Sequence, residues 1–132
     1  MDFDLPPLGV TFMDEDHQES VAGLDRLETA FAADAETALA VVDAYIAHTR
    51  DHFGREEAEM QRTGFPPYPV HQSAHARCLA AMDQAREALA AGDVDTARRF
   101  FLEDVPQWLE DHLATMDTVT AGWFQRMGAG AA

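Results

Sequence analysis

Seven side chains that can bind metal ions recur along this chain at spacings that suit helices. They are five histidines and two carboxylates: His17, His52-x-x-x-Glu56, His71-x-x-x-His75 and His112-x-x-x-x-Asp117. Three intervening residues place two side chains one turn apart on the same face of a helix. Five imidazoles and two carboxylates are too many donors for one tetrahedral zinc ion. The set instead suits two metal ions that are bridged by the carboxylates.

The composition is that of an acidic, globular chain of one domain's length. It has 132 residues, 47 % hydrophobic content and a formal net charge of −15. This charge argues against nucleic acid or an anionic membrane surface as a partner. No run approaches about 18 apolar residues, residues 1–15 contain no basic residue, and Cys78 is the only cysteine. We therefore expect no export signal, no membrane span and a reducing, cytoplasmic location.

The apolar spacing predicts four helices after an N-terminal arm at residues 1–15. Asp14 is the expected N-cap of a first helix that ends near Ala32 and carries His17 in its first turn. The others are expected to run from Asp34 or Glu36 to Arg62, from about Val70 to Ala91, and from about Thr96, capped by Asp93 or Asp95, to Met127. The pattern predicts one all-α domain over residues 1–132, an up-down-up-down four-helix bundle with a frayed tail at 128–132.

Helical periodicity tests which of the seven side chains point toward the core. In the second helix the apolar stripe is centred about 70° from His52, and Glu56 lies at about 40°, close to its centre. His71 and His75 fall within the stripe of the third helix. In the last helix His112 shares a face with Val105, Leu109, Met116 and Trp123. Buried histidines and carboxylates need a partner, and a shared metal provides one for all of them.

Two positions fit this pattern less well. In a straight helix Asp117 would stand about 100° from the centre of the apolar stripe, so it either reaches sideways or needs a π-bulge to aim it inward. Glu110 and Asp111 are its nearby competitors. Pro106 lacks a backbone donor and must kink or divide the last helix.

Other polar residues near the ligands have simpler interpretations. His48 lies one turn before His52, but it points about 110° away from the core direction, so we expect it at the surface. Cys78 is expected to be a small core residue. Glu57 and Glu59 are expected to be solvated flanking residues.

The chain resembles the hemerythrin family in its bacterial single-domain form. The resemblance rests on Leu8–Val10, Met13–His17, His52–Met60, Gly64–Pro66 before His71 and His75, Trp108–His112, and Asp117. It departs from the family pattern in three ways. A tryptophan near the start is missing, with Phe3 or Phe12 as its replacement over the site, and both Pro106 and His48 are unusual.

The resemblance implies a non-haem di-iron centre that binds dioxygen reversibly, for transport, storage or delivery. One iron would take His71, His75 and His112, and the other His17 and His52. Glu56 and Asp117 would bridge the two irons together with an oxo or hydroxo group. The second iron would then keep an open position for dioxygen.

The apolar wall of that pocket is the remaining prediction. Leu109 is the first candidate because it lies one turn before His112, with Trp108, Phe53 and Ile46 as further candidates. An oxygen-consuming enzyme is the expected recipient of the dioxygen. The alternatives are an oxygen or redox sensor acting through a separate partner, a peroxidase or nitric oxide-reducing enzyme, and a structural zinc or mixed-metal bundle. No acid or base stands out beside the pocket, so a non-enzymatic role is favoured.

Overall fold

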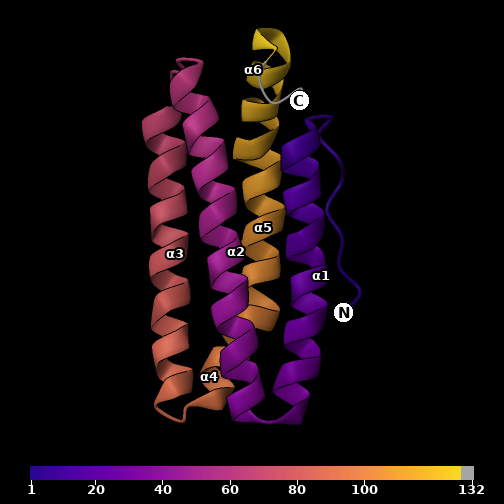
Figure 1. The fold of residues 1–132 in the computed structure, drawn as a ribbon, viewed down its shortest axis with the longest axis vertical. Coiled ribbons are helices and arrows are strands. Elements are labelled where there is room, and N and C mark those ends of the chain that lie inside the picture. Colours follow the sequence, from indigo (N-terminus) through magenta and orange to yellow (C-terminus); the bar gives the residue numbers. More distant parts are fainter. Residues whose placement is uncertain (129–132) are drawn as a thin grey trace.

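The computed structural model describes residues 1–128, which form four helical segments packed side by side (Figure 1). Three segments are uninterrupted α-helices: α1 (Thr11–Ala33), α2 (Ala35–Arg62) and α3 (Tyr68–Ala90). The fourth consists of successive helical pieces: α4 (Val94–Arg99), the π-helical η1 (Phe100–Asp104), α5 (Val105–His112), the π-helical η2 (Leu113–Asp117) and α6 (Thr118–Met127). The described residues contain no strand, and the predicted up-down-up-down bundle is confirmed.

The first helix starts earlier than the sequence indicated. It begins at Thr11, so the expected N-cap at Asp14 is wrong, the arm ends at residue 10, and His17 lies in the second turn. The Asp14 carboxylate instead accepts hydrogen bonds from the backbone N–H groups of Leu8 (2.7 Å) and Gly9 (3.0 Å). Gly9 has a φ of +85°, which lets the chain bend around this carboxylate. The arm then runs along the outside of α1 (Figure 1).

The remaining boundaries follow the expected capping residues closely. Asp93 accepts a hydrogen bond from the backbone N–H of Thr96 (3.2 Å), so Asp93, and not its alternative Asp95, is the cap. Asp34 accepts one from that of Thr37 (2.7 Å) and caps α2, whose start was expected at Asp34 or Glu36. Helix α3 starts at Tyr68 because Pro69 lies in its first turn, where no backbone donor is needed. The expected frayed tail lies outside the described residues, apart from Gly128.

Pro106 neither ends the helical path nor separates two helices. It is the second residue of α5, directly after the π-helical segment η1, and the residues on both sides keep helical dihedral angles. A π turn already departs from the regular i→i−4 pattern. The missing donor of Pro106 is therefore accommodated where the hydrogen-bond ladder is irregular, and the helical path is not broken at Pro106.

The apolar interior consists of two clusters along the bundle. The larger one includes Leu24, Leu27, Phe31, Val42, Ile46, Phe53, Met82, Leu89 and Phe101. The smaller one includes Val10, Met13, Met60, Phe65, Ala121 and Phe124. In each of the four helical segments, the predicted ligands lie in sequence mainly between the positions that supply these two clusters. Ten polar or charged residues are buried within the described chain, including all seven predicted ligands.

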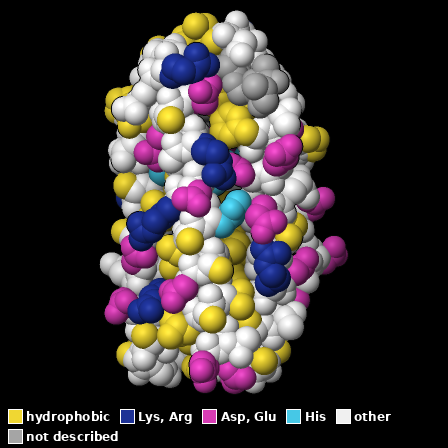
Figure 2. All heavy atoms as spheres, viewed as in Figure 1, with side chains coloured by type: hydrophobic (Ala, Val, Ile, Leu, Met, Phe, Trp, Pro, Cys, Tyr) yellow, Lys and Arg dark blue, Asp and Glu magenta, His cyan; other side chains and the backbone are white. Residues whose placement is uncertain are grey.

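The outer surface mixes both signs of charge. On the face formed by α1 and α2, acidic and basic side chains alternate and a histidine is visible near the middle (Figure 2). Arg50 pairs with Asp83 (2.8 Å) and Arg86 with Asp43 (3.0 Å), joining α2 to α3. Such exposed pairs contribute little stability individually. Among the described helices, none is long and apolar enough to cross a membrane.

Candidate metal centre

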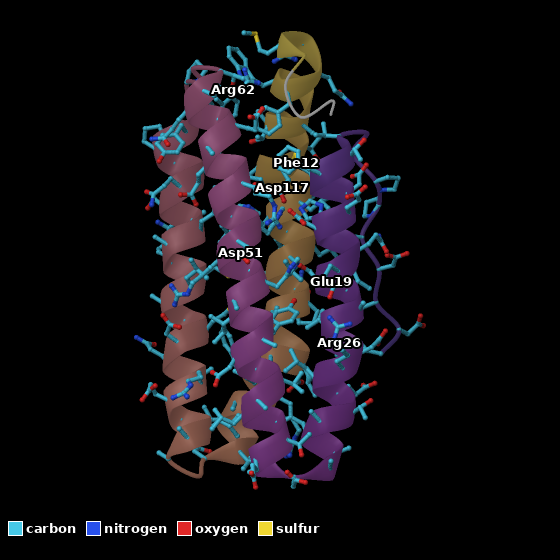
Figure 3. All side chains as sticks on the ribbon, viewed as in Figure 1. Phe12, Glu19, Arg26, Asp51, Arg62 and Asp117 are labelled. Atoms are coloured by element: carbon cyan, nitrogen blue, oxygen red, sulfur yellow. The ribbon has the colours of Figure 1, made fainter. Side chains whose placement is uncertain are left out.

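The structure brings all seven predicted side chains together inside the bundle. Two groups have ligand atoms that lie within 4.8 Å of one another: His71, His75, His112 and Asp117 in one, and His17, His52 and Glu56 in the other. All seven side chains are buried. Figure 3 places the labelled Asp117 within the bundle, behind the space between α1 and α2. Each of the four helical segments contributes at least one side chain, so the site exists only in the assembled fold.

Polar partners on the outer side of the rings orient three of the histidines. His52 donates its Nδ1–H to Asp16 Oδ2 at 3.0 Å, and His75 donates its Nδ1–H to Glu57 Oε2 at 2.9 Å. His71 Nδ1 pairs with the hydroxyl of Thr120 at 2.8 Å. A ring nitrogen that donates outward leaves the Nε2 lone pair facing inward, as metal coordination requires.

These outer partners were missed or misjudged from the sequence. Glu57 was expected to be a solvated flanking residue, but it is half-buried against His75. For Asp16 and Thr120, no contact with a histidine was predicted. Asp16 precedes His17 and Glu57 follows Glu56, yet each contacts a histidine on another helix. Helical periodicity within one segment contains no signal for such a contact.

The three-histidine group has the spacing of a metal-binding face. The Nε2 atom of His112 lies 3.0 Å from that of His71 and 3.2 Å from that of His75. With metal–nitrogen bonds of about 2.1 Å, neighbouring octahedral ligands lie about 3.0 Å apart and tetrahedral ones about 3.4 Å apart. The His71–His112 distance equals the octahedral value, and the His75–His112 distance lies midway between the two. Three imidazole nitrogens this close to one another can share a proton in pairs, or can all point their lone pairs at one cation.

Glu56 reaches both histidine groups with different oxygen atoms. Its Oε2 lies 2.7 Å from His52 Nε2 and 3.8 Å from His17 Nε2. Its Oε1 lies 3.4 Å from His71 Nε2 and 3.5 Å from His75 Nε2. A carboxylate with one oxygen in each group has the placement that a bridge between two metal ions needs.

Asp117, in the fourth helical segment, also reaches both histidine groups with different oxygen atoms. Its Oδ2 lies 3.2 Å from His17 Nε2, and its Oδ1 lies 3.1 Å from His71 Nε2 and 3.2 Å from His112 Nε2. Both oxygens of Glu56 and the Oδ1 of Asp117 are buried without a hydrogen-bond donor. Because buried carboxylates are costly without compensation, these orphaned atoms fit two cations.

A π-helical turn explains how Asp117 faces inward. The segment Leu113–Asp117 contains one residue more than an α-helical turn, and the Thr118 hydroxyl donates to the displaced carbonyl of Leu113 at 2.8 Å. The extra residue rotates the following side chains by about 100°. Asp117 thereby joins His112 on the buried face, through the predicted π-bulge rather than a sideways reach. Its two competitors, Glu110 and Asp111, are exposed.

The same rotation corrects the predicted core beyond the turn. Trp123 and Met116, which a continuous α-helix would bury, are half-buried. Phe124 is fully buried instead, and Val119 is 55 % exposed. The apolar stripe of the last helix therefore changes register at η2, and a single straight-helix phase cannot describe both of its halves.

The charges of the cluster shift the pKa values of its members strongly. Burial lowers the pKa of His52, but the charge of Glu56 and the hydrogen bond to Asp16 outweigh it and raise this pKa to about 10. Burial and the neighbouring His71 and His112 lower the pKa of His75 to about 2. Burial opposes ionisation of Asp117 as well, yet the ring nitrogens of His112, His17 and His71 beside its carboxylate hold its pKa well below the usual range. The cluster thus favours the charged forms of His52 and Asp117 and the neutral form of His75.

The neighbouring residues fall into two kinds. Phe53 stacks on His75 with ring centres 3.8 Å apart, and Trp108 stacks on His112 at 4.3 Å, so both rings border the three-histidine group.

Ile46 is buried in the larger apolar cluster, and Leu109 packs against that cluster. Phe3 also packs there, whereas Phe12 packs on Phe124, with ring centres 5.9 Å apart.

The structure also shows the surroundings of His48 and Cys78, which are not among the predicted ligands. His48 is half-buried rather than fully exposed, and it donates from Nε2 to the backbone carbonyl of Asp16 at 3.1 Å. It belongs to neither ligand group. Cys78 is buried within the larger apolar cluster, as predicted, and burial raises the pKa of its thiol to about 12.

Known proteins share both this sequence pattern and this fold. Residues 8–124 match the family model described as the hemerythrin HHE cation binding domain. A bacteriohemerythrin from Ralstonia nicotianae is 35 % identical over 92 % of this chain and 85 % of its own length. One from Aquifex aeolicus is 31 % identical over 86 % and 88 %. A crystal structure of wild-type hemerythrin superposes with a TM-score of 0.76 at 24 % identity, covering 93 % of this chain and 90 % of that chain.

Proposed function

Because this chain belongs to the hemerythrin family, it is a di-iron, oxygen-binding protein. We propose that it binds dioxygen reversibly to transport, store or deliver it. One observation carries the proposal. Each of two buried carboxylates, Glu56 and Asp117, presents one oxygen to the three-histidine group and the other to the two-histidine group. This donor set fits a pair of irons held side by side, and a single zinc ion would leave much of it unused.

We assign the ligands by the two groups. His71, His75 and His112 would hold one iron, His17 and His52 would hold the other, and Glu56 and Asp117 would bridge them. An oxo or hydroxo group would complete the centre. The two-histidine group offers one protein ligand fewer, so its iron would be the one accessible to dioxygen.

The chain's own residues make the binding reversible. When bound, an iron pair would supply the reversible two-electron chemistry that dioxygen binding needs. Asp16 and Glu57 hold His52 and His75 in place from outside, so the ligand geometry survives both states. The apolar cluster below the site excludes water and stray protons, which would otherwise leave the irons oxidised. Leu109, Trp108, Phe53 and Ile46 are the side chains proposed to wall the dioxygen pocket.

The proposed physiological setting is the delivery of dioxygen to an oxygen-consuming enzyme in the cytoplasm. Dense negative surface charge, with a net charge of −15, favours a freely diffusing carrier over one bound to anionic surfaces. No group among the described residues calls for a substrate other than dioxygen. We therefore propose a binding protein and not an enzyme.

Iron analysis and visible spectra test this function. Protein purified without oxygen should contain two irons per chain, gain a visible absorption band in air, and lose it again under vacuum through repeated cycles. Glu56→Ala should lose iron, because it removes a bridge, whereas Asp51→Ala on the exposed side of α2 should retain it. One tightly bound zinc after growth in iron-rich medium, or a band that air produces only once, would refute the proposal.

A further inference from the structure

An arginine at the surface connects to the two-histidine group through a single carboxylate. Arg55 on α2 donates from Nε to Asp16 Oδ2 at 2.9 Å and from Nη2 to Asp16 Oδ1 at 2.7 Å. The same Oδ2 accepts the Nδ1–H of His52 at 3.0 Å. The Arg55 side chain is 48 % exposed, the Asp16 side chain 15 % and the His52 side chain 5 %. Hydrogen bonds thus connect an exposed guanidinium, through one carboxylate, to the His52 ring, whose Nε2 faces the site.

The three-histidine group has a different outer partner. Glu57 accepts the Nδ1–H of His75 in the same way, at 2.9 Å. Within residues 1–128, no arginine pairs with Glu57, and its pKa is raised by burial and by the nearby charge of Glu56. The Asp16 carboxylate therefore interacts with a guanidinium as well as with its histidine, whereas the Glu57 carboxylate interacts with its histidine and with no arginine of the described chain.

This asymmetry acts on the basicity of the two histidines. A carboxylate that accepts a ligand histidine's Nδ1–H pulls on that proton and makes the imidazole a stronger donor to the metal. A stronger donor favours the ferric over the ferrous ion. A bidentate guanidinium competes for the same carboxylate electrons and weakens the pull.

We propose that Arg55 is a positioning residue that raises the reduction potential of the iron held by His17 and His52. It acts through Asp16 and His52, and it keeps that iron ferrous between rounds of dioxygen binding. The inference depends on the ligand assignment proposed above. Arg55 contacts Asp16, which lies outside both ligand groups.

The test compares two arginines on the same helix. Arg55→Gln should lower the midpoint potential, changing the ferric-to-ferrous ratio at a fixed potential by about tenfold, which is 59 mV for a one-electron couple. Autoxidation should accelerate, while iron content stays at two per chain. Arg50→Gln is the matched control, because it removes the same charge from α2 and breaks an arginine–aspartate pair, in which Nη2 of Arg50 donates to both Asp83 oxygens at 2.9 and 2.8 Å. Its potential should equal that of the wild type.

Two further variants separate charge from geometry. Asp16→Asn removes the negative charge beside His52 and should raise the potential, opposite to Arg55→Gln. Arg55→Lys keeps the charge without the two-pronged contact and should fall between wild type and Arg55→Gln. Equal shifts in Arg55→Gln and Arg50→Gln would show a mere net-charge effect, and an unchanged potential or lost iron in Arg55→Gln would also overturn the inference. Absence of two irons in the wild type would instead refute the proposed function.

Discussion

His48 and His52 show how neighbouring identical residues acquire different roles. They lie one turn apart on α2, with rings nearly parallel and 6.5 Å between centres. His52 turns its Nε2 toward Glu56, whereas the Nε2 of His48 donates to a backbone carbonyl of α1. A nitrogen that donates to a carbonyl cannot also bind a metal ion. His48 therefore fastens α2 to α1 beside the site without entering it.

Replacing each of these histidines should separate the two roles. His48→Ala should retain two irons and cost about 1 kcal/mol of folding stability, the usual contribution of one hydrogen bond. His52→Ala should lose iron from the two-histidine group. Iron analysis of both variants, with thermal unfolding of each, gives the comparison. Iron loss in His48→Ala with iron retained in His52→Ala would reverse the assignment.

Glu57 should matter for metal retention although it is not among the seven ligands. Glu57→Ala leaves the Nδ1–H of buried His75 without an acceptor, and loss of such a partner typically lowers metal affinity about 10–100-fold. Glu59→Ala, two residues further on, should leave affinity unchanged because Glu59 pairs with the exposed Arg62. Competition with a chelator measures both affinities. Equal affinities for the two variants would mean that the His75 contact has no effect on the metal.

Leu109 should control the lifetime of the oxygenated protein. It lies one turn before His112 and packs against the larger apolar cluster. Leu109→Ala should admit water to the pocket and speed the decay of the oxygenated state, with two irons retained. Leu102→Ala removes a comparable half-buried leucine packed on the same cluster and is the control. Stopped-flow spectroscopy measures the decay. The same rate in wild type and Leu109→Ala would assign the pocket wall to another residue.

At the scale of elements, the irregular fourth segment brings two ligands that are five positions apart onto one face, which a regular α-helix cannot do. Helix α1 presents one ligand, and α2 and α3 each present two ligands at a spacing that a plain α-helix satisfies. The spacing of His112 and Asp117 needs the π turn η2, which adds one residue and keeps both side chains on the buried face. An earlier π turn, η1, precedes Pro106 and takes up the loss of its donor. The two irregular turns thus have separate causes.

Deleting one residue within η2 should convert it to an α-helical turn without moving the site. Removal of exposed Ala114 leaves three residues between His112 and Asp117, which keeps them one turn apart and keeps Phe124 inward. We expect two irons and stability at or above wild type, since π turns are intrinsically unfavourable.

Removal of exposed Val119, beyond the site, is the contrasting deletion. It would rotate Thr120 away from His71 and turn Phe124 out of the core, at a cost of about 3 kcal/mol. Iron analysis and thermal unfolding compare the two deletions. Greater damage from deleting Ala114 than from deleting Val119 would show that η2 has a role beyond register.

At the scale of the whole molecule, a charged polar layer lies between two apolar clusters. Bundle packing buries Glu56 completely and Asp117 nearly so. The apolar clusters hold the helices together, and the metal ions offset the electrostatic cost of the layer between them. Iron binding is therefore coupled to folding, and iron at 1,000 times its dissociation constant would add about 4 kcal/mol of stability.

The iron-free protein should be most stable near pH 6.5, as far as its perturbed histidines determine it. The pKa of His52 rises from 6.5 to about 10, so its contribution is full below pH 6.5 and is lost as the pH rises toward 10. The pKa of His75 falls from 6.5 to about 2, so below pH 6.5 protons bind the unfolded chain preferentially and destabilise the fold. Denaturation of iron-free protein from pH 5 to about 10 tests this.

Loading with iron should remove most of that alkaline slope, because the metal replaces the proton on His52. His52→Gln in the iron-free protein should flatten it as well, since glutamine does not titrate. A slope that persists in this variant would have to come from other groups.

The sequence by itself determined the features that depend on local repetition. Helical periodicity predicted the four-helix bundle, and the positions of His71, His75 and Glu56 on apolar faces followed from spacing within single helices. Capping at Asp93 was equally local, because its side chain bonds a backbone group three residues away. Asp14 was misjudged since its carboxylate bonds the preceding loop instead.

Only the tertiary structure decided which atoms meet across helices. Asp16 and His52 are 36 residues apart, and His71 and Thr120 are 49 apart, so no periodicity within one segment relates them. The choice between a π turn and a sideways Asp117 was decided in the same way. A π turn costs local energy that only the buried cluster around Asp117 offsets, and that cluster exists only when all four helical segments are packed together.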